Sequence, residues 1–500
     1  MALAAPTSTP PTTPSSNVER LTALALAAVL GGIYAATLLP GAGYSPDTAE
    51  MQFSGRLLCV THPTGYPAYL LLSHAFSRLV PLGTLAFRAN LFSAVCSVLA
   101  CLVLRRVLVR LGTREVVAFA VPLAFGFTPT FWRLSVVAEV YSLHVLFLTL
   151  VAHALLKWKE TRNRRDLVVA CGLYAFSFGN HLTMVTLLPA LAFLVIAVRW
   201  RVILDRATVL SVGGLVLLGI LQYAYPVWRS LDPATPYLSV PVTGLAELWA
   251  YATGASFRGS MFAFSPAQLL SERVPMFARH LWRDGGPLVV LAAAGLTGFK
   301  DRVAGAFFGL AFLGHLAFAL NYDIQDVDVY FIPSTLVTAV VAGVGLDRIL
   351  RRAPARLLPA VACLSLPLAL CLAHWSRVEE GKGADKAEPM RELLADVRGG
   401  ALVVARYNDY LYLLYFALAE GRAGPWVFIG NEVSVEEIEA YLEQDRPLYL
   451  RPIRKSVPPG LPVYCSKLDL RPQLRAAGLT VQMVRPGLFR VGRGPGGVLP

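Results

Sequence analysis

Acidic and imidazole side chains gather in a short polar stretch that follows the first long hydrophobic run. Asp47 and Glu50 stand three residues apart, and His62 follows in a stretch rich in proline and glycine. A carboxylate can act as a general base, and a charged imidazole can hold a phosphate. When two carboxyl groups lie close together, the charge of one raises the pKa of the other, so one of them can stay protonated and donate a hydrogen bond. The stretch therefore predicts acid–base chemistry, and the alternative is a surface helix, capped by Asp47, followed by a rigid turn.

The composition indicates a membrane protein. The 500 residues are 55% hydrophobic and only 15% charged, and the mean hydropathy is +0.55. Since a membrane-spanning helix needs roughly 20 apolar residues, we predict an α-helical polytopic membrane protein with about eleven spans. The expected spans are residues 20–39, 86–104, 114–130, 134–156, 166–179, 182–198, 207–228, 286–299, 303–320, 329–349 and 357–374.

Basic residues cluster between alternate predicted spans. The formal net charge is +13, and its distribution favours a membrane topology signal over a nucleic-acid surface. By the positive-inside rule the clusters are cytoplasmic, so the N-terminus is inside and everything after residue 375 is outside. The stretch 68–82 would break this alternation if it spanned, and we expect it to lie on the outer surface as an interfacial helix. The clusters are residues 105–114, 157–165, 199–206, 300–302 and 348–356.

The spans suggest three parts: a disordered cytoplasmic tail (1–18), a membrane domain (19–376) and an extracytoplasmic domain (385–500). Outer loops are expected at 40–85 and 229–285. In the last part short apolar runs alternate with amphipathic ones, which predicts a small α/β domain. Its expected strands are 401–405, 426–429 and 447–450, and its expected helices are 409–420 and 433–444.

Many polar residues fall in outer loops or near the predicted outer ends of spans. A charged side chain at the bilayer centre costs at least ~2.5–3.5 kcal/mol, so ionisable residues at one level usually line a shared cavity. Glu139 and His144 could instead snorkel to water, whereas the break at Asn180 and His181 favours a cavity. The set is Asp47, Glu50, His62, Trp132, Arg133, Glu139, Tyr141, His144, Asn180, His181, Asp323, Asp326 and Asp328.

Several of these residues lie in motifs that together resemble a known family of polytopic GT-C glycosyltransferases, with bacterial members and animal protein O-mannosyltransferases. The strong match covers residues 40–190, and a later, less specific motif covers 322–326 and 330–333. Thr64 stands where the family has the second proline of His-Pro-Pro-Gly-Tyr-Pro, which should loosen the turn slightly and leave the imidazole in place. The strong motifs are Asp47-Thr-Ala-Glu50, His62-Pro-Thr-Gly-Tyr-Pro67, Phe131-Trp132, Ala138-Glu-Val-Tyr141 and Gly179-Asn-His181.

The resemblance implies a GT-C fold, a catalytic membrane domain and an active site built from the first outer loop. The enzyme would take sugar from a polyprenyl-phosphate donor by an inverting displacement, in a bacterial cytoplasmic membrane, on the periplasmic or exterior side. Asp47 would be the base, Glu50 its partner or a sugar ligand, and His62 and His181 candidates for phosphate contact. The residues expected to bind donor phosphate or sugar are His62, Tyr66, Arg133, Glu139, Tyr141, Asn180, His181, Asp326 and Tyr330.

A transporter or flippase of a lipid-linked sugar is the competing class, and a non-catalytic envelope scaffold is the third. Transporters often have two similar halves, whereas the motifs here crowd into residues 44–181. We expect no cofactor besides the lipid-linked donor and no metal, because the spacing of Asp323, Asp326 and Asp328 fits no standard cation loop. The sequence leaves open the sugar, the acceptor (protein, glycan or lipid) and any pairing of Cys59 with Cys465.

Overall fold

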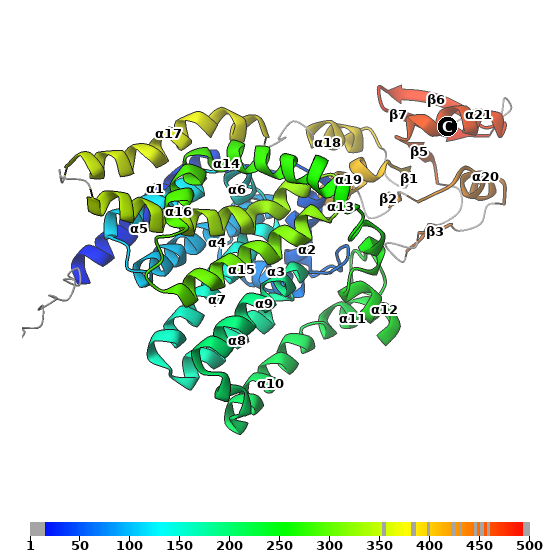
Figure 1. Ribbon diagram of the computed structural model, residues 1–500. Coiled ribbons are helices and arrows are strands. Elements are labelled where there is room, and N and C mark those ends of the chain that lie inside the picture. Colours follow the sequence, from blue (N-terminus) through cyan, green and yellow to red (C-terminus); the bar gives the residue numbers. More distant parts are fainter. Residues whose placement is uncertain are drawn as a thin grey trace, which may run out of the picture.

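Long helices pack side by side into one body, and the strands gather at one end of it (Figure 1). The computed structural model describes residues 16–352, 357–381, 387–397, 401–421, 427–430, 432–444, 448–450, 455–457 and 461–493. Most of the tail expected at 1–18 lies outside these residues.

Seven helical segments in the described part of the chain are long and apolar enough to cross a membrane. An eighth would be the pair α5 (Glu115–Gly126) and α6 (Pro129–Ser135), which bends by 76° where Pro129 starts a new helix. The seven are α1 (Ser16–Thr37), α4 (Leu85–Arg110), α7 (Val140–Thr161), α9 with its flanking 3-10 turns (Leu182–Leu204), α10 with α11 (Arg206–Leu231), α15 (Arg302–Leu320) and α16 with the preceding 3-10 turn (Val327–Arg352).

This count, made on the described residues, is lower than the eleven spans expected. Helix α8 (Arg164–Ser177) has only 14 residues, fewer than the roughly 20 that a span needs. Helix α14 (Val274–Gly295) starts earlier than expected, and its first half carries charged residues such as Arg283 and Asp284. The span expected at 134–156 begins only at Val140. A hydrophobic run alone does not reveal where a charge or a break interrupts a helix.

Other helices form the connections and the C-terminal part. Helix α3 (Pro67–Leu79) has 13 residues, too few to span a membrane. The interfacial position expected for the stretch 68–82 stays a prediction. Helix α17 (Leu357–Gly381) runs beside the bundle, and its Trp375 ring lies 5.8 Å from the Trp132 ring. The remaining helices are α2 (Pro46–Leu57), α3 (Pro67–Leu79), α12 (Leu245–Ala252), α13 (Pro266–Gln268), α18 (Glu388–Ala395), α19 (Tyr407–Leu418), α20 (Val435–Gln444) and α21 (Arg471–Ala476).

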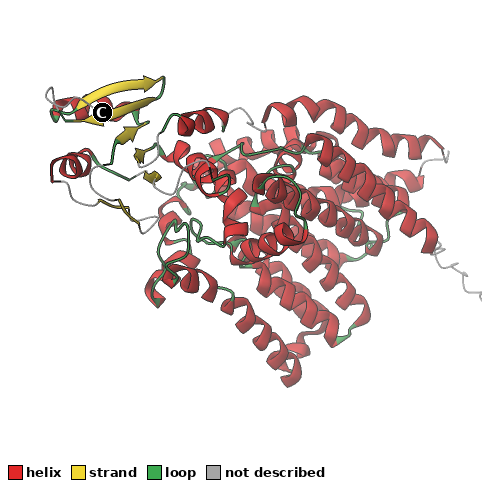
Figure 2. Ribbon diagram, turned by 180° about the vertical axis from the view of Figure 1, so that it is seen from behind, coloured by secondary structure: helices red, strands yellow, loops and turns green. Residues whose placement is uncertain are grey.

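The strands form a five-stranded sheet, in the order β2-β1-β5-β7-β6, and a separate pair of β3 with β4. Strand β1 runs parallel to β2 and β5, whereas β7 is antiparallel to β5 and β6. Figure 2 places these strands, in yellow, beside the red helical body. The three expected strands overlap β1, β2 and β3. The strands are β1 (Ala401–Val404), β2 (Val427–Gly430), β3 (Leu448–Leu450), β4 (Lys455–Val457), β5 (Val463–Cys465), β6 (Thr480–Arg485) and β7 (Leu488–Gly492).

The C-terminal part packs against α2, the helix that carries Asp47. Ala49 and Phe53 of α2 share one apolar cluster with residues of α19. The Tyr415 phenol of α19 also accepts a hydrogen bond from the Ala86 backbone N–H at 3.2 Å. The C-terminal part therefore covers one side of α2. The first turn of α2 faces the helix bundle, where Thr48 bonds Glu139. Cys59 and Cys465 lie in the same cluster as free thiols.

Candidate active site

A cavity of about 420 Å³ lies at the end of the helix bundle that the sequence predicts to face outward. Four segments that are far apart in sequence form its wall: the start of α2, the turn before α3, the start of α7 and the loop before α16. The lining residues are Tyr44, Ser45, Asp47, Met51, His62, Tyr66, Leu134, Glu139, Val140, Tyr141, Ile324, Gln325, Asp326 and Val329.

Asp47 occupies the first turn of α2 and lines the cavity with an exposed side chain. Helix α2 begins here because Ser45 Oγ accepts a 3.0 Å hydrogen bond from the Thr48 backbone N–H, and Pro46 fixes the first helical φ. The cap is therefore Ser45, and the alternative interpretation of Asp47 as the cap is wrong. The Asp47 carboxylate is not used in the cap, and it lines the cavity.

Glu50 is buried behind His62 and does not line the cavity. Its carboxylate forms an ion pair with His62 Nδ1, and it accepts hydrogen bonds from the His62 backbone N–H at 3.2 Å and from the Tyr237 hydroxyl at 3.1 Å. Burial alone would lower the pKa of His62, but the charge and hydrogen bond of Glu50 raise it to about 9. At neutral pH His62 is thus a cation, and Glu50 is the group that holds it in place.

The turn around Gly65 aims the His62 ring into the cavity. The Gly65 backbone has φ +90°, which glycine adopts most readily, and its N–H donates to the His62 carbonyl at 3.0 Å. A Cβ at this position would collide with the ring of Tyr251, whose hydroxyl donates to the Thr61 carbonyl at 2.7 Å. The side of His62 opposite Glu50 is closed by Tyr66, with 3.1 Å between His62 Nε2 and the Tyr66 hydroxyl. Tyr251, which comes from the predicted outer loop 229–285, therefore packs against this turn and restricts its conformation.

Glu139 lines the cavity just before α7 and is only 8% exposed. Burial, with smaller contributions from the negative charges of Asp47 and Asp326, raises the pKa of Glu139 to about 8, although a hydrogen bond from Thr48 opposes this. At neutral pH the carboxyl is therefore mostly protonated, and it can donate a hydrogen bond to a sugar hydroxyl. Snorkelling to water, the alternative for Glu139, does not fit its burial.

Asp326 and an aromatic wall complete the other side. Desolvation inside the site, together with the charges of Asp47 and Asp328, raises the pKa of Asp326. Tyr141 lines the cavity, and the Tyr330 ring packs against it with 6.0 Å between centroids. Aromatic faces of this kind suit the C–H faces of a sugar or an isoprenyl chain.

His181 and Asn180 lie behind this wall and do not line the cavity. The His181 ring sits 5.4 Å from that of Tyr141, and its Nδ1 accepts hydrogen bonds from Thr183. Burial, and then the positive charge of His62, lower the pKa of His181 to about 4. His181 is thus uncharged at neutral pH and supplies no charge to a phosphate. The Asn180 side chain donates to the Val140 carbonyl at 3.1 Å and so anchors the start of α7.

Arg133 of α6 also lies outside the lining. Its Nη2 forms an ion pair with Asp328 Oδ2 at 3.2 Å, and its guanidinium stacks over the Tyr44 ring at 5.6 Å. The structure thus separates the expected site residues into two groups. Asp47, His62, Tyr66, Glu139, Tyr141 and Asp326 line the cavity, whereas Glu50, Arg133, Asn180, His181 and Tyr330 lie around it.

Sequence reasoning missed three residues that shape the site: Tyr44, Thr48 and Tyr237. Thr48 lies inside the Asp47–Glu50 motif, and this position could have marked it as a site residue. Tyr237 comes from the long outer loop, and no local pattern connects it to Glu50 across 187 residues. Within the described residues, no group of three or more His, Cys, Asp or Glu side chains is arranged to hold a metal ion.

Comparison with known proteins gives matches in sequence and in fold. Residues 47–204 match the family described as protein O-mannosyl-transferase TMEM260 N-terminal domain. The mouse (Mus musculus) protein O-mannosyl-transferase TMEM260 is 26% identical over 360 residues, which cover 65% of this chain and 49% of the mouse protein. The chain thus spans about half the length of this curated relative.

Solved structures match nearly the whole chain. Apo ArnT from Cupriavidus metallidurans has a TM-score of 0.63 at 13% identity, covering 96% of this chain and 100% of ArnT. The same protein bound to undecaprenyl phosphate has a TM-score of 0.58 at 14% identity and the same coverage. Arabinofuranosyltransferase AftD from Mycobacteria has a TM-score of 0.53 at 14% identity, covering 97% of this chain and 40% of AftD. The chain is therefore an integral membrane protein with the GT-C fold, and its residues 47–204 are similar to the TMEM260 N-terminal domain.

Proposed function

We propose that the chain is an inverting glycosyltransferase that takes a sugar from a polyprenyl-phosphate donor and transfers it to a hydroxyl on the outer face of the membrane. The observation that carries this proposal is the meeting of Asp47, His62 and Glu139 around one cavity. The three supply a base, a cation and a hydrogen-bond donor, which are the groups that such a displacement uses. The TMEM260 match and the fold shared with ArnT, a protein solved with undecaprenyl phosphate, support it.

In the proposed reaction the acceptor oxygen attacks the anomeric carbon of the donor sugar. A new C–O bond forms as the bond from that carbon to the phosphate oxygen breaks, and the phosphate leaves with the bonding electron pair. The acceptor hydroxyl gives its proton to the Asp47 carboxylate. Charge develops on the leaving phosphate, and a preorganised cation nearby lowers the energy of the transition state.

His62 supplies the positive charge that would attract the donor phosphate, because it lines the cavity and is protonated at neutral pH. We assign Glu50 and Tyr237 to holding that imidazole, and not to contact with the sugar. Glu139, protonated at neutral pH, would hydrogen-bond a sugar hydroxyl, and the aromatic wall would carry the sugar face or the first isoprenyl unit.

We also propose that residues 19–376 form the catalytic membrane domain and residues 385–500 an outer α/β domain. The contact of α19 with α2 supports a role for the C-terminal part in holding the catalytic helix. Tyr407, exposed at the start of α19, has a pKa raised by partial desolvation of its phenol and then by the negative charges of Asp47 and Glu50. The matching proteins come from a mouse and from a bacterium. The bacterial cytoplasmic membrane expected from the sequence is therefore not supported, and it is not part of the proposal.

A transfer assay tests the proposal. Purified protein is incubated with a polyprenyl-phosphate sugar and a mixture of hydroxyl acceptors, and product mass is measured. A mannosyl donor is the first to use, because the mouse relative is named an O-mannosyl-transferase. We expect a product heavier by one sugar with the anomeric configuration inverted. If the lipid-linked sugar only crosses the bilayer of a proteoliposome, with no bond broken, the competing transporter function is correct.

A further inference from the structure

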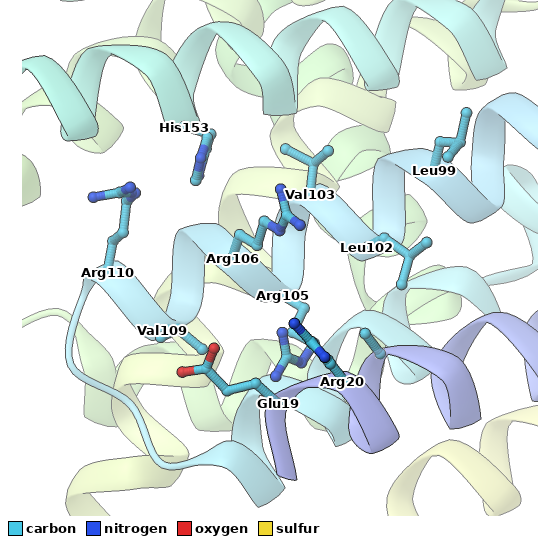
Figure 3. A pocket seen from close by; sticks show the side chains of 11 residues that line it. Glu19, Arg20, Leu99, Leu102, Val103, Arg105, Arg106, Val109, Arg110 and His153 are labelled. Atoms are coloured by element: carbon cyan, nitrogen blue, oxygen red, sulfur yellow. The ribbon is translucent and has the colours of Figure 1, made fainter. Parts of the chain in front are cut away.

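A second, basic cavity of about 820 Å³ lies between α1, α4 and α7, at the predicted cytoplasmic end of the bundle. It is remote from the candidate active site. Ser93, which contacts the Glu139 backbone, and Arg106 of this cavity are about 20 Å apart along α4 at the usual helical rise. Figure 3 shows the side chains of Arg20 and Arg105 between α1 and α4, whereas Arg106 extends from α4 toward α7, on the side where His153 lies.

Two of the cavity's four arginines have their charge offset by a carboxylate. Arg105 is only 5% exposed and donates to Glu115 at 2.7 Å and to Thr22 at 2.9 Å, and Arg110 pairs with Glu160. Arg20 and Arg106 are exposed, and neither has an ion pair among the residues that the structure describes. Glu19 is the single acid in the lining. The cavity therefore carries an excess of positive charge.

Buried side-chain nitrogen atoms around this cavity also lack hydrogen-bond partners within the described chain. They are Arg105 Nε, Arg110 Nε and His153 Nδ1. A buried N–H without a hydrogen bond is costly, so groups of this kind usually meet water or a ligand. An anion with several oxygen acceptors, such as a phosphate, would satisfy them together with the two free guanidinium groups.

The remaining wall is apolar and faces lipid. Ala23, Leu99, Leu102 and Val103 line it, and Leu99 is 44% exposed. On the neighbouring helix α1, Leu21 and Leu24 are about two-thirds exposed, at 65% and 66%. An apolar wall open to the membrane beside a cluster of arginines suits a molecule with a phosphate head and hydrocarbon tails.

We propose that this cavity binds the phosphate headgroup of an anionic phospholipid from the cytoplasmic leaflet. The arginines hold the phosphate, and an acyl chain lies along Leu99 and Leu102. Basic pockets between spans on the cytoplasmic side attract anionic lipids by the same electrostatics. The site is independent of the proposed sugar transfer, and bound lipid would fasten α1 to α4.

Lipid titration of the purified full chain in detergent tests the site, with bound lipid counted by native mass spectrometry. The probes are short-chain phosphatidylglycerol, phosphatidylcholine and inorganic phosphate in separate arms. We expect phosphatidylglycerol to bind more tightly than phosphatidylcholine and to raise the melting temperature. The double variant Arg20→Gln with Arg106→Gln should weaken its binding about 25-fold, roughly fivefold for each arginine.

Arg165→Gln is the matched control, since it removes an exposed charge at the start of α8 on the same predicted side. It should leave phosphatidylglycerol binding unchanged. Equal binding of the two lipids by the unmodified protein, or equal phosphatidylglycerol affinity in the double variant, would overturn the proposal. Binding of inorganic phosphate that displaces the lipid at matched concentration would identify a site for a free anion instead.

Discussion

The Thr48 hydroxyl donates a 2.6 Å hydrogen bond to Glu139 Oε1, and this bond joins the first turn of α2 to the start of α7. The two residues belong to motifs that lie 91 positions apart in the chain. The bond brings the Asp47 turn and the buried Glu139 carboxyl to the same cavity. Their environments differ, since Asp47 is exposed to the cavity and Glu139 is buried.

Glu139→Gln should preserve the fold and most of the turnover near neutral pH, because an amide imitates a protonated carboxyl. The folded pKa of about 8 lies above the usual value, so the native state holds the proton more tightly than the unfolded chain. Stability from this group is therefore present below about pH 4.5 and is lost as pH rises toward 8. As pH rises from about 4.5 to 8, the melting temperature of Glu139→Gln should fall less steeply than that of the unmodified protein. A Glu139→Gln enzyme as inactive as a base variant would assign Glu139 to proton transfer.

The ion pair of Glu50 with His62 predicts a second pH dependence. Since the folded pKa of His62 is raised to about 9, its stabilising contribution is full below about pH 6.5 and is lost as pH rises through 9. Glu50→Gln should remove most of this alkaline loss and should weaken donor use, because His62 becomes neutral.

Tyr237→Phe serves as the control for that experiment, since it removes only the phenol that donates to Glu50 at 3.1 Å. It should keep the alkaline loss of stability. Melting curves from pH 6 to 10 and donor dependence, measured on the same purified variants, give the comparison. If Glu50→Gln follows the unmodified protein in both measurements, the pair does not hold His62 in its charged form.

Gly65→Ala should damage the enzyme more than another glycine replacement at positive φ. Both Gly65 (φ +90°) and Gly112 (φ +81°) would incur the left-handed backbone cost of about 1–2 kcal/mol. Only at Gly65 would the new Cβ collide with Tyr251, whereas nothing lies within 4 Å at Gly112. We expect Gly112→Ala to keep its donor affinity and Gly65→Ala to lose it. Similar donor affinity in the two variants would show that the turn does not set the position of His62.

The predicted topology can be checked by cysteine labelling in intact cells. Arg165→Cys lies in a predicted cytoplasmic cluster, and Ala234→Cys lies in the predicted long outer loop; both positions are exposed. A reagent that cannot cross the membrane should label position 234 and reach position 165 only after the cells are permeabilised. Labelling of position 165 in intact cells would reverse the sidedness on which both proposed sites depend.

The sequence indicated which residues gather around one cavity better than it indicated the contacts that each of them makes. Charge clusters and motif order placed Asp47, His62 and Glu139 at one end of the bundle, and the structure brings them to one cavity. Roles depended on tertiary contacts that no local pattern encodes. Glu50 forms an ion pair with His62, and His181 is uncharged because it is buried near the positive charge of His62. Span boundaries failed for a related reason, since breaks at Pro129 and before Val140 interrupt runs that composition treats as continuous.

The most direct test of the account is the turnover of Asp47→Asn with a polyprenyl-phosphate sugar donor. The asparagine is nearly the same size and keeps the Ser45 cap of α2, so the variant should fold and bind donor normally. As the proposed base is lost, the rate of sugar transfer should fall by ~10²–10⁴-fold with an unchanged melting temperature. A folded Asp47→Asn enzyme that transfers sugar at the unmodified rate would contradict the central claim.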